Sequence, residues 1–282
     1  MQIPPKPGHI HTLEFVRILT PYVLAHDIVK GKTVLELGCG LGYGVWLLVT
    51  GGASRVVALD LDKAKIFHTV GSCPYVNSGR LCAIVADGQA LPFRDCSFQV
   101  VTNFEVIEHV SEPFSLLSEL ARVLRTDGIL LLTTPNRSAR LFPLQRPWNP
   151  EHMREYTFRA LQKGLREFFP SFKILGIYGN PELHKFYKMM WKRTASQYYR
   201  DRVLRVIRIA IPSFVRTWIK NLYHHNISSP KLSLDIAIPA SIPGDWPFYI
   251  DDVTKDCLGF FAICGFDNRF VCQVTNGIKR LG

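Results

Sequence analysis

Three side chains that can bind a metal ion or accept a proton lie within five consecutive residues of this chain. They are Glu105, Glu108 and His109, in the segment "FEVIEHV", with spacing i, i+3 and i+4. If one helical turn follows the apolar run before them, all three lie on one face of that turn. Carboxylates and imidazoles can together bind Mg²⁺ or another divalent ion with coordination positions left open. Without a metal, a histidine or a carboxylate of this kind can act as a general base or acid, so His109 and Glu108 are candidate catalytic residues.

Short apolar runs predict the buried strands that would hold these residues at one edge of a sheet. An amphipathic segment at 113–125 begins with a proline and is followed by Gly128, which predicts a helix between two of these strands. Strands that alternate with helices form right-handed βαβ units and a mostly parallel sheet, so the fold class is α/β. The predicted strands are 33–38, 55–60, 81–87, 98–104, 128–134, 172–179 and 258–264, the last of them at the edge of the sheet.

A glycine-rich stretch, "VLELGCGLGYG", directly follows the first apolar run. Gly38, Gly40 and Gly42 form G-x-G-x-G, where the absence of side chains lets the backbone approach a ligand closely. The dinucleotide-binding fingerprint is G-x-G-x-x-G, which differs from this spacing. The stretch therefore predicts a turn between strand and helix that holds a nucleoside-like ligand.

With Glu36 two residues before Gly38, this stretch resembles motif I of class I S-adenosylmethionine-dependent methyltransferases, including the ubiquinone-type O-methyltransferases. The resemblance extends over about residues 30–136 and implies a Rossmann-like, mostly parallel seven-stranded sheet with helices on both faces. It implies S-adenosylmethionine as cofactor, with Asp60 accepting hydrogen bonds from both ribose hydroxyls and Asp87 contacting the adenine amino group. The cofactor-binding residues expected from it are Glu36, Gly38, Cys39, Gly40, Gly42, Asp60, Leu61, Asp87, Gly88 and Phe104.

The resemblance also implies that a histidine later in the chain acts together with the Glu105–His109 segment. The sequence E-V-I-E-H is common among ubiquinone-type O-methyltransferases, and a similar E-x-x-E-H with a later histidine binds a divalent metal there and in small-RNA 2′-O-methyltransferases. Here the later histidine would be His152, in "NPEHMREYT". The implied metal ligands are Glu105, Glu108, His109 and His152, and without a metal His109 or His152 would be the general base.

The second half of the chain holds the positive charge. Of the net charge of +11, residues 137–223 contribute 18 basic and 5 acidic side chains. In 198–225, Arg202, Arg205 and Arg208 recur every three residues among apolar ones. This pattern suits a helix at a membrane surface, a lid over the substrate, a plain structural cap, or a face that binds nucleic acid. We expect a lid with some peripheral membrane contact; no recognisable RNA-binding module supports nucleic acid.

Residues 1–180 and 256–272 are assigned to the S-adenosylmethionine-binding domain, and 181–255 to a helical and irregular insertion. The seven cysteines include no C-x-x-C pair, and the N-terminus lacks a signal peptide, which favours a cytoplasmic protein. The predicted function is O-methylation of a small polyhydroxylated, quinone-like or lipid-linked sugar acceptor. Two alternatives stay open: an RNA 2′-O-methyltransferase and a non-catalytic scaffold that binds S-adenosylmethionine.

Overall fold

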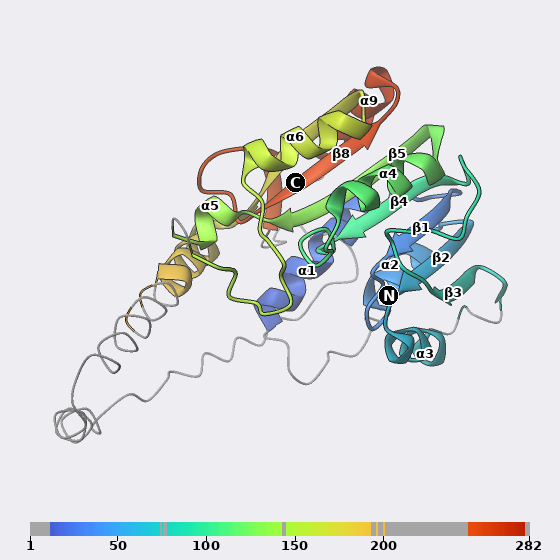
Figure 1. The fold of residues 1–282 in the computed structure, drawn as a ribbon, viewed down its shortest axis with the longest axis horizontal. Helices are drawn as coiled ribbons and strands as arrows, with labels where there is room; N and C mark the ends of the chain where they lie inside the picture. The colour runs from blue at the N-terminus through green and yellow to red at the C-terminus, as the bar shows by residue number, and fades with distance from the viewer. Residues whose placement is uncertain are drawn as a thin grey trace.

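A computed structural model of the chain describes residues 12–73, 75, 78–142, 145–192, 196, 200 and 248–279. Its centre is one twisted sheet of eight strands in the order β3-β2-β1-β4-β5-β8-β6-β7 (Figure 1). The strands are β1 (Thr33–Leu37), β2 (Arg55–Asp60), β3 (Leu81–Val85), β4 (Phe98–Phe104), β5 (Leu124–Pro135), β6 (Ser171–Gly179), β7 (Phe248–Asp252) and β8 (Gly259–Gly265). The predicted Rossmann-like α/β class is confirmed.

The sheet has a parallel part and an antiparallel part. Strands β3, β2, β1, β4 and β5 pair in parallel, whereas β8 runs antiparallel to both β5 and β6, and β6 pairs antiparallel with β7. Within the described residues the sheet has eight strands, where seven were expected. The prediction of an edge position for 258–264 was wrong, because every residue of β8 is buried between two neighbours. Strand β7 extends the sheet into the range 181–255, which the sequence had assigned to an insertion.

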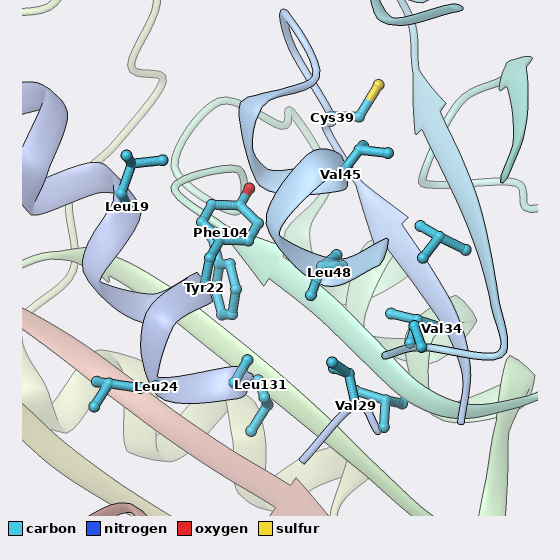
Figure 2. Close-up of a cluster of buried hydrophobic side chains, with 14 of the residues drawn as sticks. Leu19, Tyr22, Leu24, Val29, Val34, Cys39, Val45, Leu48, Phe104 and Leu131 are labelled. Atoms are coloured by element: carbon cyan, nitrogen blue, oxygen red, sulfur yellow. The ribbon is translucent and has the colours of Figure 1, made fainter. Parts of the chain in front are cut away.

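Helices cover both faces of the sheet, because alternate residues of the central strands point to opposite sides. On one face, Val34 of β1 packs in an apolar cluster formed with α1 (Thr12–Ala25), α2 (Tyr43–Thr50), α3 (Lys63–Ser72) and α9 (Asn268–Lys279). Figure 2 shows part of this cluster, with Tyr22 of α1 beside Phe104 of β4. On the other face, Leu35 packs with α4 (Pro113–Val123) and α6 (Phe158–Phe168). A short helix, α5 (Arg137–Arg140), follows β5.

A third apolar cluster joins the start of the predicted insertion to the rest of the fold. Tyr187 and Trp191, in the helical run 181–192, are buried with Val16 of α1 and Phe248 of β7. The basic segment 198–225, with the membrane, lid and nucleic-acid interpretations placed on it, lies outside the described residues apart from Arg200. Within the described part of the chain, no helix combines the length and apolar character that a membrane span requires.

Candidate active site

The glycine turn between β1 and α2 lies against the segment after β4. Gly38, Gly40 and Gly42 all have positive φ, at 72°, 53° and 84°. A Cβ at Gly38 would lie 2.4 Å from Cγ2 of Val106, so any other residue there would have to displace the Val106 side chain. The turn therefore has the open backbone that the motif predicted, and it directly contacts the candidate catalytic turn.

Asp60, the last residue of β2, holds this turn in place. Its Oδ2 accepts a 2.9 Å hydrogen bond from the N–H of Gly40, and its Oδ1 accepts one of 2.9 Å from the N–H of Asp62. Each carboxylate oxygen has a second acceptor position. The side chain thus fits a role in which it receives ribose hydroxyls next to the glycine turn, as expected from the sequence.

Glu36 is a buried residue of β1, close to the glycine turn. It is fully buried, and its Oε1 accepts a 2.5 Å hydrogen bond from the hydroxyl of Tyr22, while Oε2 accepts one from the hydroxyl of Thr102. Burial raises its pKa to about 7, against the lowering effect of these two hydrogen bonds. The cofactor contact expected of Glu36 stays a prediction; in the structure this side chain ties α1, β1 and β4 together.

Two other expected cofactor contacts also have side chains turned into the core. Phe104 is buried and its ring meets that of Tyr22 edge-on, with centroids 4.8 Å apart (Figure 2). Cys39 is buried too, with Sγ 3.8 Å from the hydroxyl oxygen of Thr69. Burial raises the pKa of this thiol to about 12. At these positions the backbone, rather than the side chain, is what a ligand in the turn could meet.

Three expected residues lie at the open edge of the sheet. Leu61, directly after Asp60, is 71% exposed. Asp87 is exposed as well, and its Oδ1 accepts a 2.9 Å hydrogen bond from the N–H of Gln89. Gly88 lies close to the apolar core, where a Cβ would be 3.0 Å from Leu37. These positions follow the carboxyl ends of β2 and β3, where nucleotide-like ligands bind parallel sheets.

The segment after β4 is a tight turn rather than the expected helical turn. Glu105 has φ of +56°, and the N–H of His109 donates to the carbonyl of Val106 across 2.9 Å. As a result Glu105 does not lie with Glu108, His109 and His152, the group in which it was predicted. Its Oε2 instead forms an ion pair with Arg17 of α1, in which Nη2 of Arg17 donates a 2.9 Å hydrogen bond. Among the described residues, the set with metal-ligand spacing does not include Glu105.

Glu108, His109 and His152 do come together. One potential ligand atom of each lies within 4.8 Å of those of the other two. The two imidazole rings meet edge-on with centroids 4.6 Å apart. The backbone of the 149–155 loop holds them near each other, since the N–H groups of Met153 and Arg154 both donate to the carbonyl of Glu108. The predicted link between the acidic segment and the later histidine is therefore present.

Hydrogen bonds fix which atoms this group presents. Nδ1 of His109 lies 3.1 Å from the carbonyl oxygen of Glu151, and Nδ1 of His152 lies 3.2 Å from Oε1 of Glu155. A carbonyl oxygen can only accept, so Nδ1 of His109 is the donor and its Nε2 is left with a lone pair; where Oε1 of Glu155 accepts, His152 has the same arrangement. Glu108 adds Oε1, which is buried with no hydrogen-bond partner, while Oε2 accepts from Thr134. Oε1 of Glu108 thus lies beside the two imidazoles with no hydrogen-bond donor of the protein directed at it.

Burial sets the protonation of this group. The pKa of Glu108 is raised, first by burial and then by the charge of Glu105. The pKa of His109 is lowered, first by burial and then by His152. At neutral pH, His109 is therefore a neutral base, and burial makes Glu108 hold its proton more strongly than a free carboxyl unless a cation compensates its charge.

Several residues of the site gave no signal in the sequence. Tyr22 and Thr102 belong to separate elements and meet only at Glu36. Arg17 and Glu105 are 88 positions apart. The spacing of His152 and Glu155, three residues apart in "EHMRE", was the one local pattern that could have revealed a pair.

A methyltransferase family model matches the part of the chain that holds the glycine turn and the Glu108–His109 turn. Residues 35–132 match the family model described as "Methyltransferase domain". That range extends from β1 through the glycine turn, Asp60 and the Glu108–His109 turn into β5. The sequence resemblance is thereby confirmed for this part of the chain.

The chain is similar to three curated or solved proteins in particular. It is 42% identical over 134 residues to a probable S-adenosylmethionine-dependent methyltransferase of Mycolicibacterium smegmatis, covering 47% of this chain and 49% of that protein. It is 32% identical over 169 residues to a ubiquinone biosynthesis O-methyltransferase of Xanthomonas campestris, covering 58% and 65%. The solved YcgJ protein of Bacillus subtilis shares the fold, with 15% identity, a TM-score of 0.50 and coverage of 88% and 98%. The chain spans about half the length of the curated relatives it matches first.

Proposed function

We propose that this protein transfers a methyl group from S-adenosylmethionine to an oxygen atom of a small or lipid-linked acceptor that carries hydroxyl groups. The observation behind the proposal is the convergence of Glu108, His109 and His152 beside the glycine turn. An oxygen acceptor is also what the name of the ubiquinone biosynthesis relative suggests. Quinone-like and sugar acceptors both remain within this proposal.

The residues of the site supply proton acceptance and orientation. A hydroxyl near the cluster would donate to the free Nε2 of His109 or His152, which increases electron density on the oxygen that attacks the methyl group. Asp60 and the glycine backbone would fix the cofactor so that the reacting atoms meet in line. Methyl transfer needs no protein nucleophile, so a positioned base and a held cofactor are sufficient.

The same three residues fit a divalent cation. Converging lone pairs without a donor are stabilised by a positive charge, and the orphaned Oε1 of Glu108 supplies the anionic ligand. Two imidazoles with one carboxylate suit Mn²⁺, Fe²⁺ or Zn²⁺ better than Mg²⁺, which prefers oxygen ligands. Such a cation would bind an acceptor hydroxyl and lower its pKa. Because Glu105 is paired with Arg17, the expected ligand set for Mg²⁺ or another divalent ion loses one of its two carboxylates.

Calorimetry tests the core of this proposal. S-adenosylmethionine and its demethylated product should both bind to the wild-type protein. If the wild-type protein has no measurable affinity for either compound, the proposal is overturned. A panel of catechols and sugars with radiolabelled cofactor then tests the oxygen acceptor. Labelling of an acceptor at nitrogen or carbon alone would show that the reaction class is different.

Activity found in that panel also tests the cation. The assay is repeated after a chelator and again with Mn²⁺, Zn²⁺ or Mg²⁺ restored. Activity that survives the chelator unchanged would leave His109 and His152 as bases without a metal.

A further inference from the structure

Glu155 is a buried acidic residue that the reaction proposed above does not use. Its side chain has no exposed surface, and it lies at the end of the loop that brings His152 to the site. Oε1 is 3.2 Å from Nδ1 of His152 and 3.8 Å from Nη1 of Arg140. A buried carboxylate needs such partners, because an unpaired charge in the interior is costly.

The contacts continue beyond Arg140 into the third apolar cluster. The guanidinium of Arg140 lies over the rings of Trp148 and Trp191, at 5.5 and 5.9 Å from their centroids. Trp191 belongs to the helical run 181–192 and is buried. Arg140 is thus fixed on one side by two indole rings, and Glu155 is fixed between Arg140 and His152.

This arrangement decides which nitrogen of His152 faces Glu108 and His109. Where Oε1 of Glu155 accepts the hydrogen bond across this 3.2 Å contact, Nδ1 of His152 carries the proton and Nε2 is left without one. Imidazoles that act as bases or metal ligands are commonly oriented by a carboxylate on their other nitrogen. Without that acceptor, His152 could place its proton on Nε2, where it would block both roles.

We propose that Glu155 is a positioning residue that holds His152 as the Nδ1–H tautomer, with Nε2 directed to the site. The inference concerns the same site as the proposed methyl transfer and in its functional meaning rests on that proposal. Which tautomer His152 adopts can be measured without any methyl acceptor. Glu155 acts through His152 and need not touch cofactor or acceptor.

The test is ¹H–¹⁵N long-range NMR of the histidine side chains in the full chain, labelled with ¹⁵N-histidine, treated with chelator and held at one pH above 7. His152 signals are assigned from their loss in His152→Gln. Wild-type His152 should show the Nδ1–H pattern. Glu155→Leu should lose that pattern in favour of Nε2–H, whereas Glu155→Gln, which keeps an accepting oxygen, should retain it.

The matched control is Glu151→Leu, the same change four residues earlier in the loop, at an exposed side chain. It should leave His152 as in the wild type. An Nε2–H pattern in the wild type, or an Nδ1–H pattern that survives in Glu155→Leu, would overturn the inference. An Nε2–H pattern in the wild type would overturn the inference even if Glu155→Leu does not fold, and Glu155→Gln then tests the carboxylate. Cofactor binding measured on the same samples separates this outcome from failure of the methyltransferase proposal.

Discussion

The N–H of Gly40 donates a 2.9 Å hydrogen bond to Oδ2 of Asp60, so the glycine turn after β1 and the carboxylate at the end of β2 form one unit. Residues 20 positions apart are thereby held at the same edge of the sheet. Two functions meet in Asp60, because the oxygen that fixes the turn also has a free acceptor position toward the ligand side.

Asp60→Ala should abolish most binding of S-adenosylmethionine. Hydrogen bonds to a charged group contribute about 1.5–3 kcal/mol each, so the loss of two predicts an affinity lowered on the order of 100-fold or more. Isothermal calorimetry measures the effect. The matched control is Asp62→Ala, which removes the cap that accepts from the N–H of Ala64. That variant should lose about 1 kcal/mol of stability and keep its cofactor affinity; equal binding losses in both variants would contradict the role given to Asp60.

Glu108 and Glu105 should behave differently toward metals, although the sequence pattern treats them alike. Glu108→Gln removes a ligand, and because loss of an outer partner already costs about 10–100-fold in metal affinity, a larger drop is expected. Glu105→Gln should not weaken Mn²⁺ binding, since Oε2 of Glu105 is engaged by Arg17. Titration followed by the electron paramagnetic resonance of free Mn²⁺ measures both. If Glu105→Gln loses as much affinity as Glu108→Gln, the three-residue set is wrong.

Glu36 should make stability depend on pH. Its pKa is raised from 4.5 to about 7 in the folded protein, so the folded state binds more protons than the unfolded state between these values. Stability should therefore fall as pH rises through that window, by a total of about 3 kcal/mol from this residue. Urea unfolding of wild type and Glu36→Gln at pH 5 and pH 8 gives the difference. Titrating histidines change the stability of both proteins equally, so their effect cancels in the comparison. A stability difference between the two proteins that does not change with pH would contradict the raised pKa of the buried Glu36 carboxyl.

Gly44→Ala should destabilise the fold. A Cβ there would lie 2.1 Å from Cε1 and Cζ of Tyr22. The ring cannot retreat easily, because Glu36 binds its hydroxyl and Phe104 packs on its face. We expect a loss of about 1–3 kcal/mol, measured by chemical denaturation. Gly277→Ala in α9 is the control, since nothing lies within 4 Å of its Cβ position. That change should stabilise by about 0.5–1 kcal/mol, as alanine replaces glycine in a helix.

Much of the parallel half of the fold could be predicted from local patterns. Each buried strand is a short apolar run, and Asp60 and Asp87 follow two of them. The antiparallel half could not be ordered in this way. Whether 258–264 lies at an edge or between two strands depends on which partners reach it, and a strand sequence does not encode its neighbours.

The sequence by itself determined the chemistry available at the carboxyl edge of the sheet. Glycines without side chains, a carboxylate after β2, and an acidic turn followed by histidines are properties of residue type and order. Tertiary structure alone decided which of these groups act together. A positive φ at Glu105 and an arginine on α1 removed that carboxylate from the cluster, while a loop 40 residues later delivered His152 to it. The physical reason is that hydrogen bonds and ion pairs between distant segments form only once packing has brought them together, and burial then sets the protonation of each group.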